Sequence, residues 1–113
     1  MSGEVQICIE CGAAPGERLH AAMAEAFRDP GLAALRTRRV ACLGNCDRRC
    51  RLNIADADRW TWFFGDLNPE RDVAFLSEAL ALWLASPNGL IPKSARPQRL
   101  VDTALGRSPP VKR

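Results

Sequence analysis

The sequence predicts a single α/β sandwich, and three observations support this fold class. The 113 residues suffice for one compact hydrophobic core and not for a second. Two apolar patterns alternate along the chain. In one, every second residue is apolar, which is typical of strands, and in the other, apolar residues recur on one helical face. Apolar residues make up 47% and charged residues 26% of the chain, which are ordinary proportions for a globular domain.

The first part of the chain predicts a strand, a helix and a second strand. Apolar residues at every second position indicate a strand over 4–10, and a loop containing glycine and proline ends it. Apolar residues at helical spacing over 17–28 indicate an amphipathic helix, which Asp29-Pro30-Gly31 stops. The segment 35–42 is rich in arginine and ends at a cysteine, and we expect the second strand there.

The second part predicts a hairpin and a long helix. Segments 51–56 and 59–66 have the composition of two strands joined by a short turn. One face of the second of these strands is aromatic, formed by Trp60, Trp62 and Phe64. Asn68 is a suitable N-cap and Pro69 suits the first helical position, so we expect a helix over 68–86.

This order of elements suits a two-layer or three-layer sandwich, and the thioredoxin-like fold is one such solution. We assign residues 1–86 to this domain and residues 87–113 to a basic, proline-containing C-terminal extension. The extension carries six basic residues against Asp102 alone, so its net charge is +5 and the rest of the chain carries −2. It could dock on an acidic partner or remain a solvated tail.

The sequence predicts a cytoplasmic protein with no membrane contact. No apolar run approaches the roughly 18 residues that a membrane span requires, and the first twelve residues lack the features of a secretory signal. In a reducing compartment, the five cysteines indicate metal binding or redox chemistry rather than structural disulfides.

The cysteines fall into two groups, each just beyond a predicted strand. Cys8 and Cys11 form a C-x2-C pair, whereas Cys42, Cys46 and Cys50 form C-x3-C-x3-C. Because parallel neighbouring strands end on the same side of a sheet, we expect the two groups to converge. Four thiolates at one point suit Zn²⁺ or an iron–sulfur cluster.

The run Cys42-Leu43-Gly44-Asn45-Cys46 resembles the C-L-G-x-C loop of thioredoxin-like [2Fe–2S] ferredoxins. The resemblance implies four cysteine ligands to a [2Fe–2S] cluster, namely Cys8, Cys11, Cys42 and Cys46. Cys50 could substitute for Cys11 as the fourth ligand, or it could be a buried thiol that opens the next strand. The function that the resemblance implies is one-electron transfer or redox sensing rather than enzymatic catalysis, because the chemistry belongs to the cluster.

Over nearly its whole length, the sequence is similar to a family of small prokaryotic proteins of unknown function that are predicted to bind metal. Members of that family have an early C-x2-C pair, a central C-x3-C-x3-C run, an aromatic strand ending in Phe-Gly-Asp-Leu, and a late Arg-Pro element. The matching segments here include 42–50, 62–67 and Arg96-Pro97.

Two other function classes stay open on the sequence. A structural zinc-binding module that recruits a protein or a nucleic acid is the alternative, because four sulfurs alone do not distinguish zinc from iron. A thiol–disulfide oxidoreductase could use Cys8 and Cys11. A Rieske centre is excluded, because it needs two histidines and the chain has only His20.

For the electron carrier we expect a redox partner protein with an acidic docking surface. The basic residues that would attract it, and would raise the reduction potential of a nearby cluster, are Arg48, Arg49 and Arg51. A nucleic acid partner is not expected, because the aromatic strand is more simply explained as the face that packs against the long helix. A homodimer is left open.

Overall fold

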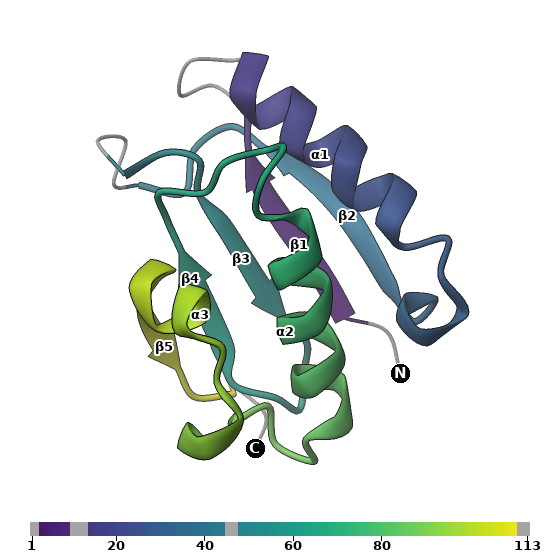
Figure 1. Cartoon of the computed structure of the whole chain (residues 1–113), viewed down its shortest axis with the longest axis vertical. Coiled ribbons are helices and arrows are strands. Elements are labelled where there is room, and N and C mark those ends of the chain that lie inside the picture. The colour runs from purple at the N-terminus through teal and green to yellow at the C-terminus, as the bar shows by residue number, and fades with distance from the viewer. Residues whose placement is uncertain (1–2, 10–13, 45–47, 111–113) are drawn as a thin grey trace.

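The computed structural model describes residues 3–9, 14–44 and 48–110 and confirms the α/β fold class (Figure 1). The elements in chain order are β1 (Gly3–Cys8), α1 (Ala14–Ala26), β2 (Leu35–Val40), β3 (Leu52–Ala55), β4 (Thr61–Phe64), α2 (Val73–Ala85), α3 (Gln98–Thr103) and β5 (Ala104–Ser108). Within the described ranges, we find no helix with the length and apolar character needed to cross a membrane.

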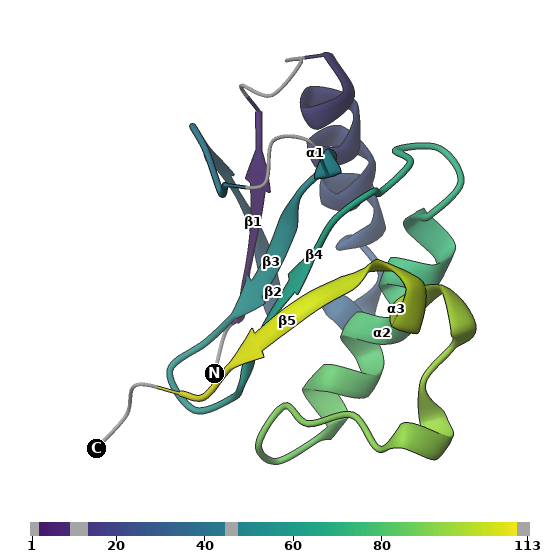
Figure 2. The same ribbon diagram turned by 90° about the vertical axis from the view of Figure 1, so that its left-hand side faces the viewer.

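The strands form one sheet in the order β2-β1-β3-β4-β5. β1 and β2 run parallel, because α1 carries the chain from the end of one strand back to the start of the other. The remaining neighbours are antiparallel. Helices α1 and α2 lie on the same face of the sheet, so the molecule has two layers (Figure 2).

The hydrophobic core lies between the sheet and these two helices. In the register of β1 with β3, Val5 faces Ile54 and Ile7 faces Leu52, and all four side chains are fully buried. Helix residues complete the core, among them Leu19, Met23, Leu76, Leu80 and Trp83. Because side chains alternate along a strand, Cys8, Arg51 and Asn53 project from the opposite face, which the helices leave uncovered.

The described part of the segment 87–113 is built into the sheet rather than extending from it as a tail. β5 pairs with β4 in antiparallel register, and Leu100 and Thr103 of α3 are fully buried. The sequence pattern does not predict β5, because this strand contains few apolar residues and a glycine. An edge strand of this kind is only half-buried and therefore needs no strict alternation.

Helix α2 begins later than the sequence predicts, at Val73 instead of Asn68. The Oδ1 of Asn68 does accept hydrogen bonds from the backbone N–H groups of Glu70 (3.0 Å) and Arg71 (2.7 Å), as an N-cap would. These bonds close a turn ahead of the helix, and the carboxylate of Asp72 also accepts a hydrogen bond from the backbone N–H of Asn68 at 2.7 Å. The N-cap of α2 is therefore Asp72.

Candidate metal centre

Two of the predicted ligands lie at the end of the sheet where β1 and β2 stop side by side (Figure 1). Cys8 is the last residue of β1 and is in register with Val40, the last residue of β2. The Cys8 thiol is buried and donates a hydrogen bond to the carbonyl oxygen of Ala41 at 3.6 Å. Cys42 follows in the same loop and is exposed. Parallel pairing thus brings Cys8 beside the start of the loop that carries Cys42.

The other two predicted ligands, Cys11 and Cys46, lie outside the described residues, so their part in the site stays a prediction. Within residues 3–9, 14–44 and 48–110, no three His, Cys, Asp or Glu side chains are gathered closely enough to hold a metal ion.

The turn after Cys42 directs a backbone donor at its sulfur. The N–H of Gly44 lies 3.3 Å from the Cys42 Sγ. Gly44 has a φ of 80°, in the left-handed region that glycine adopts without strain. A hydrogen bond from a backbone N–H stabilises negative charge on a sulfur. The glycine of the C-L-G motif therefore allows the turn in which a backbone N–H stabilises a Cys42 thiolate.

Cys50 is part of the hydrophobic core instead of the open face. Its side chain is 4% exposed and packs within the same cluster as the core residues of the sheet and helices. Burial raises the pKa of the Cys50 thiol and outweighs the opposing charge of Arg18. These features favour a neutral packing role for Cys50, which is one of the two interpretations that the sequence left open.

The Phe-Gly-Asp-Leu segment (residues 64–67) is hydrogen-bonded to the end of the loop between β2 and β3, which carries Cys42, Cys46 and Cys50 and is called the cysteine loop below. The backbones of Leu67 and Cys50 exchange two hydrogen bonds of 3.3 Å, and the N–H of Asp66 donates to the carbonyl of Arg48 at 2.6 Å. The Arg48 Nε also donates to the Asp66 carboxylate at 2.7 Å, and this bond lowers the pKa of Asp66. A Cβ at Gly65 would lie 2.9 Å from the Arg48 carbonyl oxygen, so this close approach requires glycine.

An ion pair between buried Asp72 and partly exposed Arg99 connects α3 to this segment. Arg99 donates to both carboxylate oxygens of Asp72, from Nε and Nη2 at 2.9 Å each, and its Nη2 also donates to the carbonyl of Asp66 at 2.9 Å. Burial alone would raise the pKa of Asp72. The hydrogen bonds from Arg99 and from the N–H of Asn68 outweigh burial and hold this pKa below its ordinary value.

We expect Asp72→Asn to lower the free energy of unfolding at neutral pH by about 2 kcal/mol, because it weakens the hydrogen bonds that a buried carboxylate accepts from Arg99 and from the backbone. The pKa of Asp72 is lower in the folded state than in the unfolded state. Its stabilisation is therefore complete above the unfolded pKa of ~3.9 and is lost as the pH falls through the folded value.

Urea unfolding of the wild type and Asp72→Asn at several pH values tests this prediction. The difference between them should shrink below about pH 4. Asp102→Asn, which removes an exposed carboxylate from α3, should have little effect and is the control. A difference between wild type and Asp72→Asn that stays constant down to the lowest pH would contradict the assignment.

Arg51 is buried on the open face of the sheet, behind the cysteine loop. Its side chain is 3% exposed, whereas Arg48 and Arg49 are exposed. Its Nη1 donates to the carbonyl of Phe64 at 2.5 Å and to the Oδ1 of Asn53 at 3.1 Å. Its Nη2 donates to the carbonyl of Leu43 at 3.4 Å, so the guanidinium bridges the sheet and the cysteine loop. The sequence pattern assigns the same role to Arg48, Arg49 and Arg51 and does not predict the burial of Arg51.

The guanidinium of Arg51 has an unbalanced charge and an unused donor. No ion pair formed within the described residues includes it, and its buried Nε has no hydrogen-bond partner among them. Burial lowers the pKa of Arg51, and negative charge on Cys8 or Cys42 acts in the opposite direction. A buried guanidinium is costly unless an anion balances it. Thiolates at Cys8 and Cys42 would supply that negative charge.

Comparison with known proteins places the chain in a family and a fold. Residues 5–110 match the family described as "Protein of unknown function (DUF1636)". No curated protein sequence matches the chain significantly. A structure of a thioredoxin-like [2Fe–2S] ferredoxin from Aquifex aeolicus is 16% identical, with a TM-score of 0.68 over 99% of this chain and 98% of its own. A crystal structure of the wild-type thioredoxin-like [2Fe–2S] ferredoxin from Aquifex aeolicus is 15% identical, with a TM-score of 0.67 over 93% and 97%.

These comparisons confirm the resemblance found in the sequence and the thioredoxin-like fold. At 15–16% identity, the likeness to the ferredoxins extends to the fold alone.

Proposed function

The chain belongs to the DUF1636 family. We propose that it binds a [2Fe–2S] cluster and acts as a one-electron carrier or redox sensor. The proposed ligands are Cys8, Cys11, Cys42 and Cys46. When bound, such a cluster supplies a single-electron couple and gains one negative charge on reduction.

The observation that carries the proposal is the unbalanced charge of Arg51. A guanidinium that is 3% exposed lies within electrostatic range of Cys8 and Cys42, and its buried Nε has no partner in the described part of the chain. An anionic centre on these sulfurs would balance the charge and could accept the free N–H. The sulfur ligands and the Arg51 guanidinium therefore fit a cluster held by thiolates, in which Arg51 is the buried counter-charge.

Other residues have roles that suit the same centre. Gly44 directs its N–H at the Cys42 sulfur, which stabilises the thiolate that a metal requires. Cys8 is held by the pairing of two strands, so its position is set by the core. Exposed Arg49 could attract an acidic redox partner to this end of the sheet, whereas the charge of Arg48 is already paired with Asp66.

The fold of the neighbours supports iron over zinc. The two solved structures compared above are each named as a [2Fe–2S] ferredoxin, and each matches nearly the whole chain. A four-sulfur site could also hold Zn²⁺, which has no redox chemistry. A redox measurement therefore separates the two metals.

A reductive titration of anaerobically purified protein tests the function. We expect the visible absorption to bleach on addition of one electron per chain and to recover on reoxidation, with a potentiometric slope for a single electron. Cys42→Ala, purified in the same way, should show no such absorption. A wild-type protein that contains metal but does not respond to dithionite would contradict electron transfer.

A further inference from the structure

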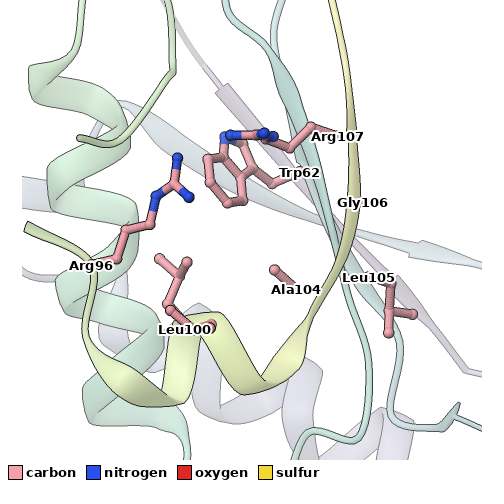
Figure 3. Close-up of a pocket in the computed structure, with 8 residues that line it drawn as sticks. Trp62, Arg96, Leu100, Ala104, Leu105, Gly106 and Arg107 are labelled. Atoms are coloured by element: carbon pink, nitrogen blue, oxygen red, sulfur yellow. The ribbon is translucent and has the colours of Figure 1, made fainter. Parts of the chain in front are cut away.

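A second candidate site is a pocket of 230 Å³ between the sheet and α3 (Figure 3). It contains no cysteine. The residues that matter for its chemistry are Trp62, Arg96, Leu100, Val101, Ala104 and Arg107. Arg96 belongs to the Arg-Pro element that stood out in the sequence and that the proposed cluster does not explain.

Two guanidinium groups lie against one indole ring in this pocket. The Cζ of Arg96 is 5.2 Å from the ring centroid of Trp62, and the Cζ of Arg107 is 5.1 Å from it. Arg107 is the cross-strand neighbour of Trp62 in the pairing of β4 with β5. Arg96 is fixed by a hydrogen bond of 2.8 Å from its Nε to the carbonyl of Ile91. Both cations are thus held near the same ring.

Neither cation is balanced by a carboxylate in the ranges that the structure describes. Eight of the other eleven described arginines form ion pairs, whereas Arg96 and Arg107 form none. Burial and the neighbouring charge of Arg107 both lower the pKa of Arg96. Two like charges in one pocket repel each other, and a bound anion would relieve that repulsion.

The part of the pocket away from the arginines is apolar. Figure 3 shows Leu100 and Ala104 on the side formed by α3 and the start of β5, across from the guanidinium groups. Val101 also lines the pocket, and it is 55% exposed, an unusual position for a large apolar residue in this molecule. The pocket therefore has a cationic side and an apolar side.

We propose that this pocket binds a small organic anion, with its carboxylate or phosphate between Arg96 and Arg107 and its apolar part against Leu100, Ala104 and Val101. A guanidinium presents a planar fork of donors that suits either anion. The volume of 230 Å³ admits a small acid, since sites for larger, drug-sized ligands start at about 300 Å³. The proposal does not depend on the cluster.

Isothermal titration calorimetry of the full-length, metal-loaded protein tests it with phenyl phosphate, benzoate and inorganic phosphate as probes. We expect saturable binding of phenyl phosphate, benzoate or both, and the comparison of the two shows which head group the arginines prefer. Inorganic phosphate should bind about tenfold more weakly than the better of these two, because it lacks the apolar part. Equal affinity for inorganic phosphate, or no saturable binding of any probe, would overturn the proposal.

Variants separate the site from general attraction of anions. Arg107→Gln should weaken binding of the better probe about tenfold or more, because a hydrogen bond to a charged group is lost. Arg107 is exposed, and its side chain forms no hydrogen bond or ion pair with the described residues, so this variant should fold. Arg96→Lys keeps the charge without the fork and should also weaken binding. Arg36→Gln removes an exposed arginine from β2 and should bind as the wild type does. Equal effects of Arg36→Gln and Arg107→Gln would overturn the proposal.

Discussion

Cys8→Ala is expected to abolish cluster binding, whereas Cys50→Ala is expected to retain it. Both thiols are buried, so each variant removes a group of the same size from a buried position. Cys8 is held at the end of β1 beside the cysteine loop, on the face that carries Arg51. Cys50 packs in the core with a raised pKa, which opposes the thiolate form that a metal requires. Iron content and the visible spectrum of the two variants, purified side by side, provide the measurement.

The same comparison identifies the fourth ligand. We expect Cys11→Ala, Cys42→Ala and Cys46→Ala to behave as Cys8→Ala does. If Cys11→Ala retains iron and Cys50→Ala loses it, the fourth ligand is Cys50 and not Cys11. Retention in Cys8→Ala would contradict the placement of the centre at the end of β1.

Arg51→Gln is expected to lower the reduction potential of the bound cluster by on the order of 100 mV, which is about 2 kcal/mol for one electron. The reason is electrostatic, because the buried guanidinium offsets the negative charge that reduction adds. Potentiometric titration followed by visible absorption measures the shift. Arg51→Lys retains the charge and should retain most of the potential.

Thermal unfolding of both variants controls for damage to the structure, because Arg51 also bonds to the backbone of Phe64 and Leu43. If Arg51→Gln does not fold, exposed Arg49→Gln gives a weaker version of the test, in which a smaller decrease is expected. A folded Arg51→Gln protein with an unchanged potential would show that Arg51 is not the counter-charge of the centre.

Much of the fold could be predicted because its signals are local. The alternation in β1, the amphipathic helix α1 and the aromatic strand β4 each bury one face, and their patterns therefore show the element directly. Chain order then favours a sheet in which β1 and β2 are parallel, because a helix connects them. This pairing also accounts for the placement of Cys8 beside the loop of Cys42.

The features that could not be predicted depend on contacts between distant segments. β5 is defined by its pairing with β4 and not by its own composition. The turn that precedes α2 is bonded to the carboxylate of Asp72, which is held by Arg99 from α3. The direction of the Arg51 side chain could have been inferred from alternation, because Leu52 and Ile54 face the core and residues 51 and 53 must face away. Its burial could not, because it depends on a contact with Leu43 in the cysteine loop, which the sequence does not place.

Metal analysis of anaerobically purified, full-length protein is the most direct test of whether the cysteines hold a [2Fe–2S] cluster. Iron, zinc and acid-labile sulfide are measured in the same sample, together with the visible spectrum. We expect a reddish-brown protein with about two iron and two sulfide per chain and little zinc. A colourless protein with about one zinc per chain and no sulfide would contradict it.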